Sequence, residues 1–188
     1  TEFIIEAFEK YFIDKKQKLN IIDLGTGSGC IAISLAKEYI NSIITANDIS
    51  ENALNVAKRN AKKFNIGNQI KFICCDWIDI DKVYDVIVSN PPYLTISEYK
   101  NIGKEIINYE PEIALIGGKD GLSCYRKLAN KFPKITHSNS LCFIEIGHNQ
   151  KTESIKIFEE FGMNCIDIIV DYQNYERILV LKKKLNKY

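Results

Sequence analysis

The sequence lacks the features that are typical of membrane, nucleic-acid-binding and secreted proteins. No apolar run approaches the ~20 residues that span a bilayer, and no signal peptide opens the chain. The formal net charge is only +1 at pH 7, so no basic field favours a nucleic acid or an anionic membrane. Internal repeats and low-complexity segments are also absent. We therefore expect no membrane partner, no direct nucleic-acid binding, and a cytoplasmic location, or an organellar matrix if the source is eukaryotic.

Paired metal-ligand spacing is absent as well. The six cysteines are Cys30, Cys74, Cys75, Cys124, Cys142 and Cys165. None forms a C-x-x-C pair, which tetrahedral zinc sites usually contain, so no metal site is expected. Most lie in apolar segments, and buried, reduced thiols favour a reducing compartment such as the cytosol. The two histidines, His137 and His148, are expected to have surface or structural roles.

What the sequence does contain suits one α/β domain. The chain has 188 residues, of which 46% are hydrophobic and 26% charged, as in ordinary globular proteins. We expect a single domain over 1–188 and see no boundary within it. Nothing in the sequence demands an oligomer, so we expect a monomer.

Short apolar runs alternate with helical patterns along the chain. Strands are expected at 19–24, 42–47, 69–74, 84–89, 141–146, 165–170 and 177–181. Helices are expected at 1–13, 30–39, 50–64, 120–132 and 152–161. The last two strands should form an antiparallel hairpin around Gln173-Asn174. The pattern predicts a seven-stranded, mostly parallel sheet with an antiparallel C-terminal hairpin and helices on both faces.

Residues 94–119 lack clear periodicity, although 96–107 could hold a helical turn or two. We interpret them as an insertion above the binding edge of the sheet, ending in Tyr109-Glu110-Pro111 and Gly117-Gly118. Long loops beside such an edge are usually functional or mobile.

A glycine-rich turn follows the first expected strand. Gly25-Thr26-Gly27-Ser28-Gly29 separates that strand from a helix, which is typical of a nucleotide-type binding corner. A dinucleotide fingerprint would have Gly or Ala in place of Cys30. Asp23, just upstream, either belongs to the site or is a structural acceptor for the N–H groups of the turn.

Acidic and aromatic residues follow the next two strands. Asp48 lies ~20 positions after the glycines, where an acid typically binds ribose hydroxyls. Asp76 and Trp77 follow the third strand. Each is weak evidence alone, because acids often begin helices and a lone tryptophan is often core. A doubly wound sheet, however, gathers such strand ends around one cleft.

The strongest signal is the end of the fourth strand. Val86-Ile87-Val88 is a buried, β-branched run that stops at Asn90-Pro91-Pro92-Tyr93. The prolines have no N–H for a neighbouring strand, and Pro91 biases Asn90 towards an extended backbone. The corner presents a fixed amide, carbonyl groups and an aromatic face. It could receive a planar group that carries an NH₂.

In this order and spacing, DLGTGSG, NDIS, CDW and SNPPY resemble the class I methyltransferases that use S-adenosylmethionine. More narrowly, NYEPEIALIGGKDGLSCYRKLA, FIEIGHNQ and DYQNYERILVLKK are similar to the HemK/PrmC family. That family methylates the glutamine amide in the Gly-Gly-Gln motif of peptide chain release factors. The resemblance covers nearly all of the chain, and Thr1-Glu2 resembles the tail of the family's Pro-Arg-x-x-Thr-Glu segment. We expect the family's N-terminal helical docking domain to be absent from this chain, and Asn47 takes the place of a usually small apolar residue.

The resemblance implies a Rossmann-like class I methyltransferase fold. It also implies S-adenosyl-L-methionine as cofactor, S-adenosyl-L-homocysteine as product and a release factor as partner. The implied cofactor-binding residues are Gly25, Thr26, Gly27, Ser28, Gly29, Asp48, Asp76, Trp77 and Asn90. The implied catalytic residues are Asn90, Pro91, Pro92 and Tyr93. On this hypothesis the Asn90 oxygen and the Pro91 carbonyl accept the two amide N–H bonds, while Tyr93 stacks on the amide plane.

Two alternatives stay open. NPPY alone is less specific, because amino-methyltransferases that act on adenine carry similar tetrapeptides. Methylation of adenine or guanine in DNA or RNA would require a basic groove, which the overall charge does not support. A non-catalytic S-adenosylmethionine-binding module is the other alternative, and the intact motif residues count against it.

Overall fold

The computed structural model describes residues 2–103 and 110–185. In chain order the elements are α1 (Glu2–Tyr11), β1 (Asn20–Leu24), α2 (Cys30–Glu38), β2 (Ile43–Asp48), α3 (Glu51–Lys63), β3 (Ile70–Cys74), the 3₁₀ turn η1 (Trp77–Asp79), β4 (Tyr84–Ser89), α4 (Ile96–Asn101), α6 (Glu112–Leu115), α7 (Ser123–Ile135), β5 (Thr136–Glu145), α8 (Lys151–Glu160), β6 (Met163–Val170) and β7 (Glu176–Lys183). Among the described residues, no helix has the length and apolar character that a membrane crossing requires.

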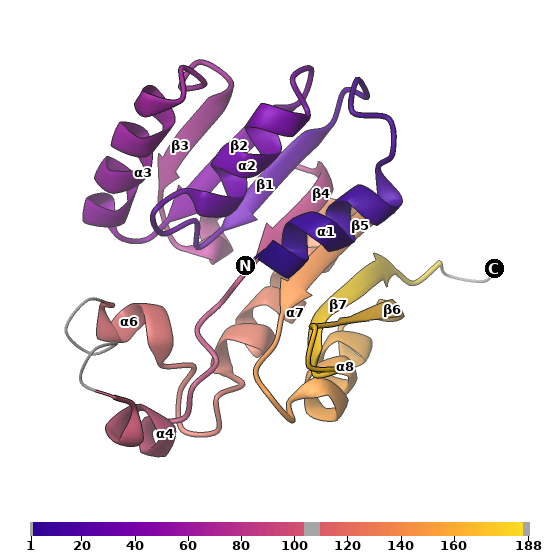
Figure 1. Ribbon diagram of the computed structural model, residues 1–188. Coiled ribbons are helices and arrows are strands. Elements are labelled where there is room, and N and C mark those ends of the chain that lie inside the picture. The colour runs from indigo at the N-terminus through magenta and orange to yellow at the C-terminus, as the bar shows by residue number, and fades with distance from the viewer. Residues whose placement is uncertain (1, 104–109, 186–188) are drawn as a thin grey trace.

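One seven-stranded sheet organises the molecule, in the order β3-β2-β1-β4-β5-β7-β6 (Figure 1). Strands β1 to β5 pair in parallel. Strand β7 is antiparallel to both β5 and β6. The predicted mostly parallel sheet and antiparallel C-terminal hairpin are therefore confirmed. The strand order reverses between β1 and β4, which is where a doubly wound sheet forms its ligand crevice.

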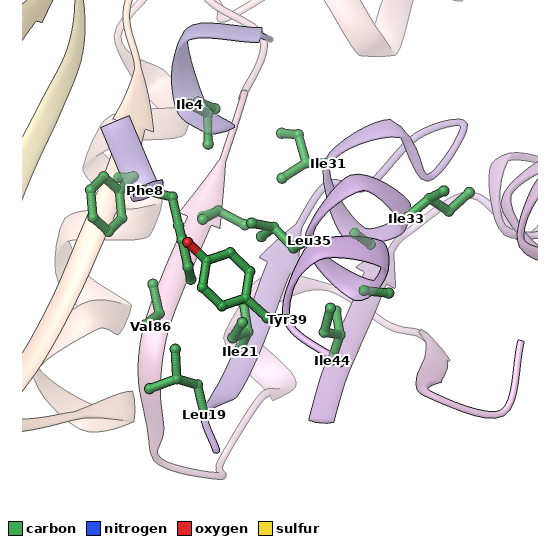
Figure 2. Packing of buried hydrophobic residues seen from close by; sticks show 14 of the residues in the cluster. Ile4, Phe8, Leu19, Ile21, Ile31, Ile33, Leu35, Tyr39, Ile44 and Val86 are labelled. Carbon is green, nitrogen blue, oxygen red and sulfur yellow. The ribbon is translucent and has the colours of Figure 1, made fainter. Parts of the chain in front are cut away.

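Helices cover both faces of the sheet, and successive residues of the central strands point to opposite sides. Ile21 belongs to the core under α1 and α2, whereas Ile22 belongs to the core under α7 and α8. Figure 2 shows the first of these cores, in which Phe8 and Tyr39 lie over β1 and β4. Burial on both faces explains why the strand sequences are continuous apolar runs rather than alternating ones.

The predicted helix boundaries hold closely, with one extension. The Ser50 side chain accepts the Ala53 N–H and caps α3, as expected. Helix α7 runs past its predicted end to Ile135 and carries Pro133 in its last turn. Ile135 is fully buried, and its packing offsets the backbone hydrogen bond that a proline cannot make.

The expectation of buried thiols is wrong in part. Cys142 is buried, but Cys30 and Cys74 are exposed. Cys30 begins α2 on its solvent side, and Cys74 ends the edge strand β3, where no neighbouring strand covers it. All six cysteines are free, and among the described residues no group of three or more His, Cys, Asp or Glu could hold a metal ion.

Both histidines are exposed, as expected for surface or structural roles. His137 lies with its Nε2 2.9 Å from Asp85 Oδ1, where β4 and β5 begin. The His148 ring packs edge-on against Tyr175.

Candidate functional site

A cavity of about 750 Å³ lies where β1 to β4 end. Gly25, Gly27 and Ser28 line it after β1, and Asp48 after β2. Asp76 and Trp77 follow β3, and Asn90 and Pro92 follow β4; these residues line the same cavity. The structure thus brings together groups from four strand ends that the sequence predicted would meet.

The glycine turn needs glycine at three positions, for different reasons. Gly25, Gly27 and Gly29 all have positive φ, at 73°, 56° and 86°. A Cβ on Gly25 would lie 3.3 Å from the Trp77 ring, whereas one on Gly27 would meet no atom within 4 Å. A Cβ on Gly29 would lie 3.0 Å from the Ala57 Cβ. Gly25 and Gly27 therefore shape the cavity, and Gly29 permits the close packing of α2 on α3.

Asp23 is a structural acceptor beneath the turn. It is fully buried, and its Oδ2 accepts the Thr26 hydroxyl (2.6 Å) and the Ala32 N–H (3.1 Å). Burial raises the pKa of Asp23 to about 7, against the opposing effect of these two hydrogen bonds. Thr26 and Gly29, both predicted to bind cofactor, support the turn and are absent from the described lining of the cavity.

Asp48 holds the turn and faces the cavity. Its Oδ2 accepts the Gly27 N–H (2.9 Å), and its Oδ1 accepts the Ser50 N–H (2.9 Å). One carboxylate thereby links the glycine turn to the start of α3. Asp48 is partly exposed and lines the cavity beside Gly27, so it can also accept hydrogen bonds from a ligand.

Asp76 and Trp77 form a further wall. The Asp76 carboxylate accepts the Ile78 N–H and caps η1. Lys131, a buried lysine of α7, donates from Nζ to the Ile78 carbonyl (2.7 Å) and so fastens η1 to that helix. Sequence reasoning missed Lys131, because a lysine in an amphipathic helix gives no sign of a distant partner.

The Asn-Pro-Pro-Tyr corner divides into a cavity side and a buried side. Ser89 Oγ donates to the Leu24 carbonyl (2.7 Å), which ties the end of β4 to β1. The described residues that line the cavity include Asn90 and Pro92 but not Pro91 or Tyr93. Pro91 is buried, and the Tyr93 ring lies against Gly147, where an added Cβ would be 2.9 Å from Tyr93 Cδ2. Burial raises the pKa of Tyr93.

The inserted segment lies at the cavity, as predicted. Leu94 donates its N–H to the Leu115 carbonyl (3.0 Å), and Gly117 donates to the Leu94 carbonyl (2.8 Å). These bonds hold the residues after α6 against the exit of the corner. α4 and α6 lie together at one end of the molecule, apart from the helices that flank the sheet (Figure 1). The expected contribution of Tyr109, and the turn predicted at 104–107, lie outside the described residues.

Several lining residues were missed by sequence reasoning. They are Ile49, Asn52, Ala53, Val56, Ile113, Ala114, Ile116, Ser123, Cys124 and Lys127. Ser123, Cys124 and Lys127 share one face of α7, with the i, i+1, i+4 spacing of neighbours on a helix. Their spacing was readable, but which face of the helix meets the cavity depends on the tertiary fold.

Comparison with known proteins adds three findings. Residues 1–132 match the family described as Methyltransferase small domain. A bifunctional methyltransferase of Rickettsia prowazekii is 43% identical over 165 residues, which is 87% of this chain and 32% of that protein. A release factor glutamine methyltransferase of Agrobacterium fabrum is 33% identical over 187 residues, which is 97% of this chain and 65% of that protein. The chain thus spans about a third of the first relative and under two thirds of the second.

A solved structure of a methylase has the same fold as this chain. The ribosomal protein L11 methylase of Lactobacillus delbrueckii subsp. bulgaricus superposes with a TM-score of 0.69 at 19% sequence identity. The match covers 97% of this chain and 77% of that one. The predicted Rossmann-like α/β fold is confirmed.

Proposed function

Because this chain belongs to the methyltransferase small domain family, we propose that it transfers a methyl group from S-adenosyl-L-methionine to a glutamine side-chain amide in the Gly-Gly-Gln motif of a peptide chain release factor. The resemblance to the HemK/PrmC family is confirmed by relatives named release factor glutamine methyltransferases. One observation carries the proposal. Asn90 and Pro92 line the same cavity as Gly25, Gly27 and Asp48, so an amide and a cofactor can meet there.

The cavity residues fit S-adenosyl-L-methionine. The space that a side chain at Gly27 would occupy is open, so a ligand can approach the backbone of the turn there. In our proposal, 25–29 faces the methionine and ribose, Asp48 accepts the ribose hydroxyls, and Asp76 with Trp77 flanks the adenine. When bound, this cofactor supplies a sulfonium methyl group open to attack, and it leaves as S-adenosyl-L-homocysteine. Asp48 is suited to its role because it lines the cavity and each carboxylate oxygen can accept a further hydrogen bond besides the one from Gly27 or Ser50.

Asn90 and Pro91 would hold the substrate amide. The Tyr93 carbonyl accepts a hydrogen bond from Gln150, and the Pro92 carbonyl faces Gly117, where an added Cβ would lie 2.6 Å away. Although Pro91 itself is buried, it lies in the chain between Asn90 and Pro92, which both line the cavity, and we assign its carbonyl as the backbone acceptor beside the Asn90 side-chain oxygen. Accepting both N–H bonds fixes the rotation of the amide and enriches its nitrogen, which is otherwise a weak nucleophile. Positioning and electrostatics then supply the acceleration, and the proton can leave after attack.

Tyr93 is assigned a supporting role in this corner. Its ring packs against Gly147, away from the described cavity lining. Stacking of Tyr93 on the amide plane stays a prediction from the sequence.

The test is mass spectrometry of a release factor after incubation with isotopically labelled S-adenosylmethionine. We expect one added methyl on the glutamine of the Gly-Gly-Gln motif. A release factor whose motif glutamine is replaced by glutamate is the matched control, since it keeps the loop and lacks the amide. No label on the wild-type factor would overturn the proposal, and label in added DNA or RNA would favour the amino-methyltransferase alternative.

We also propose that the protein acts as a monomer in the cytoplasm, or in an organellar matrix, without direct contact to nucleic acid. The formal net charge of +1 supports the last point. Light scattering on the purified protein, with and without release factor, tests the stoichiometry.

A further inference from the structure

One side-chain amide joins three loops behind the Asn-Pro-Pro-Tyr corner. Gln150 lies immediately before α8, and its Nε2 donates to the Tyr93 carbonyl (2.9 Å), with a longer contact of 3.5 Å to the Gly121 carbonyl. Its Oε1 accepts the Tyr125 hydroxyl (3.0 Å) and the Gly147 N–H (3.1 Å). The loop after β4, the approach to α7 and the loop after β5 therefore meet at a single carboxamide.

The partners fix which way this amide points. A backbone N–H can only donate and a backbone carbonyl can only accept, so the oxygen must face Gly147 and the nitrogen must face Tyr93. No other residue type supplies a donor and an acceptor in this shape at neutral pH, apart from the shorter asparagine. Glutamate would match the shape but would set an oxygen against the Tyr93 carbonyl.

The residues around the Gln150 amide pack closely against it. A Cβ added at Gly121 would come within 2.6 Å of Gln150 Nε2, and one at Gly147 within 2.6 Å of Gln150 Oε1. Gly121 also has a φ of 73°, which other residues rarely adopt. Tyr125 is fully buried. The two glycines and the tyrosine thus form a close-fitting seat, so the amide has a restricted set of positions.

The seat is separate from the cofactor side of the cavity. The described lining of the cavity includes neither Gln150 nor its partners Tyr93, Gly121, Tyr125 and Gly147. Gln150 reaches the Asn-Pro-Pro-Tyr corner through Tyr93, the last residue of the corner that begins at Asn90.

From this geometry we propose that Gln150 is a positioning residue for methyl transfer: it holds the Tyr93 carbonyl and so sets the orientation of Asn90 and Pro91 towards the substrate amide. The role in transfer rests on the proposed function, whereas the holding of the corner does not. A displacement of about 1 Å at a reacting centre can reduce the rate about 100-fold, so a residue that only positions can still control turnover.

The decisive variant is Gln150→Glu, which keeps the shape and the acceptors and removes the donor to Tyr93. We expect kcat on a release factor to fall about 100-fold near pH 8, while the Kd for S-adenosylmethionine, measured by calorimetry, changes less than about threefold. Protonation of the new carboxyl restores a donor, so the ratio of variant to wild-type kcat should rise as the pH is lowered towards about 6. A residue with a merely structural role would lower both parameters and show no such recovery.

Two control variants test whether the loss of kcat comes from the missing donor to Tyr93. Tyr125→Phe removes the hydroxyl that donates to the same Gln150 oxygen and accepts the Gly147 N–H (3.3 Å), but it leaves the bond from Gln150 to Tyr93, so kcat should fall less than about tenfold. Gln173→Glu makes the same chemical change at an exposed turn and should leave kcat and the Kd unaltered. An unchanged kcat in Gln150→Glu, or an equal loss in kcat and cofactor affinity, would overturn the proposal.

Amide hydrogen exchange separates this inference from the proposed function, because it needs no substrate. In Gln150→Glu the amides of Leu94 and Gly117, which bond across the exit of the corner, should exchange faster. The amides of Gly25 and Ala32 around the glycine turn should be unchanged. If wild-type protein fails to label any release factor, the proposed function fails while exchange still decides the role of Gln150. Exchange that rises equally in both regions, or in neither, would contradict the proposed role of Gln150.

Discussion

The two sides of the cavity are built by different means. On the side that we propose for the cofactor, the glycine turn is held by Asp23 and Asp48, which lie close to it at the ends of adjacent strands. On the side that we propose for the substrate, the Asn-Pro-Pro-Tyr corner is held by Gln150, which lies far along the chain, and by the segment after α6. One side is encoded by short motifs, and the other depends on the completed tertiary fold.

The difference has a consequence for function. A turn fixed by its own glycines and adjacent carboxylates keeps its shape when distant residues change, which suits a cofactor common to many methyltransferases. A corner fixed by remote contacts can change its orientation when those contacts change. We infer that loss of a remote contact to the Asn-Pro-Pro-Tyr corner should affect turnover more than cofactor binding, and each prediction below breaks or sharpens this division.

The largest effect should follow Asn90→Ala. Removing the acceptor for the substrate amide should lower kcat about 1,000-fold, or about 4 kcal/mol in the barrier, as for loss of one strong transition-state hydrogen bond. Binding of S-adenosylmethionine should stay within about an order of magnitude, because the glycine turn is intact. Single-turnover methylation and calorimetry check both values. Full activity would remove Asn90 from the mechanism, and lost cofactor binding would break the division.

Asp23→Asn should change how stability depends on pH. The pKa of Asp23 is raised from its ordinary value of 3.8 to about 7, so the folded state keeps a proton that the unfolded state loses. The stability that this group contributes is therefore fully present below about pH 4, decreases by up to about 4 kcal/mol as the pH rises to about 7, and does not change further above that pH. The amide that replaces this carboxyl cannot ionise, so the difference in unfolding free energy between variant and wild type should follow this curve.

Urea unfolding of both proteins at several pH values between about 4 and 8 measures that difference. Groups with lowered pKa, such as Asp85 and Asp167, contribute the opposite slope in both proteins and cancel. A difference that does not vary with pH would show that burial of Asp23 does not oppose its ionisation.

Asp48→Ala should weaken S-adenosylmethionine binding by about 2 kcal/mol, the scale of lost hydrogen bonds to a charged acceptor. At saturating cofactor, kcat should be close to wild type, since Asn90 is untouched. Asp48→Asn is the control, because it keeps an acceptor for the Gly27 N–H. Unchanged affinity in Asp48→Ala by calorimetry would remove Asp48 from the cofactor site.

The sequence anticipated the structure of the glycine turn better than the contacts that hold the Asn-Pro-Pro-Tyr corner, for physical reasons. Positive φ at Gly25, Gly27 and Gly29 follows from glycine itself, and the position of Asp48 follows from the strand that it ends. Central strands buried on both faces have a continuous apolar pattern, and the partly exposed edge strands β3 and β6 still contain short apolar runs, so all seven could be placed. By contrast, the contact between Gln150 and Tyr93 joins residues with no local pattern in common.

The same reasoning explains which predicted residues lie outside the described cavity lining. Thr26 and Gly29 belong to the glycine motif, yet the contacts that each makes depend on Asp23 and on the packing of α3. Exposure of Cys30 and Cys74 depends on which element lies at an edge of the fold, which apolar neighbours in sequence do not reveal.

The smallest effect tests a remote contact on the proposed cofactor side, between Lys131 and η1. Lys131→Met removes the hydrogen bond to the Ile78 carbonyl but keeps the apolar stem of the side chain, so η1 should lose about 1 kcal/mol of local stability. Trp77 begins η1 and is the only tryptophan in the chain, so its fluorescence anisotropy reports the loosening directly. We expect lower anisotropy and cofactor affinity weakened about fivefold, with kcat at saturation unchanged. Lys134→Met, an exposed change on the same helix, should alter none of these. If Lys131→Met lowered kcat and left affinity unaltered, remote contacts would govern turnover on both sides of the cavity, and the division would not hold.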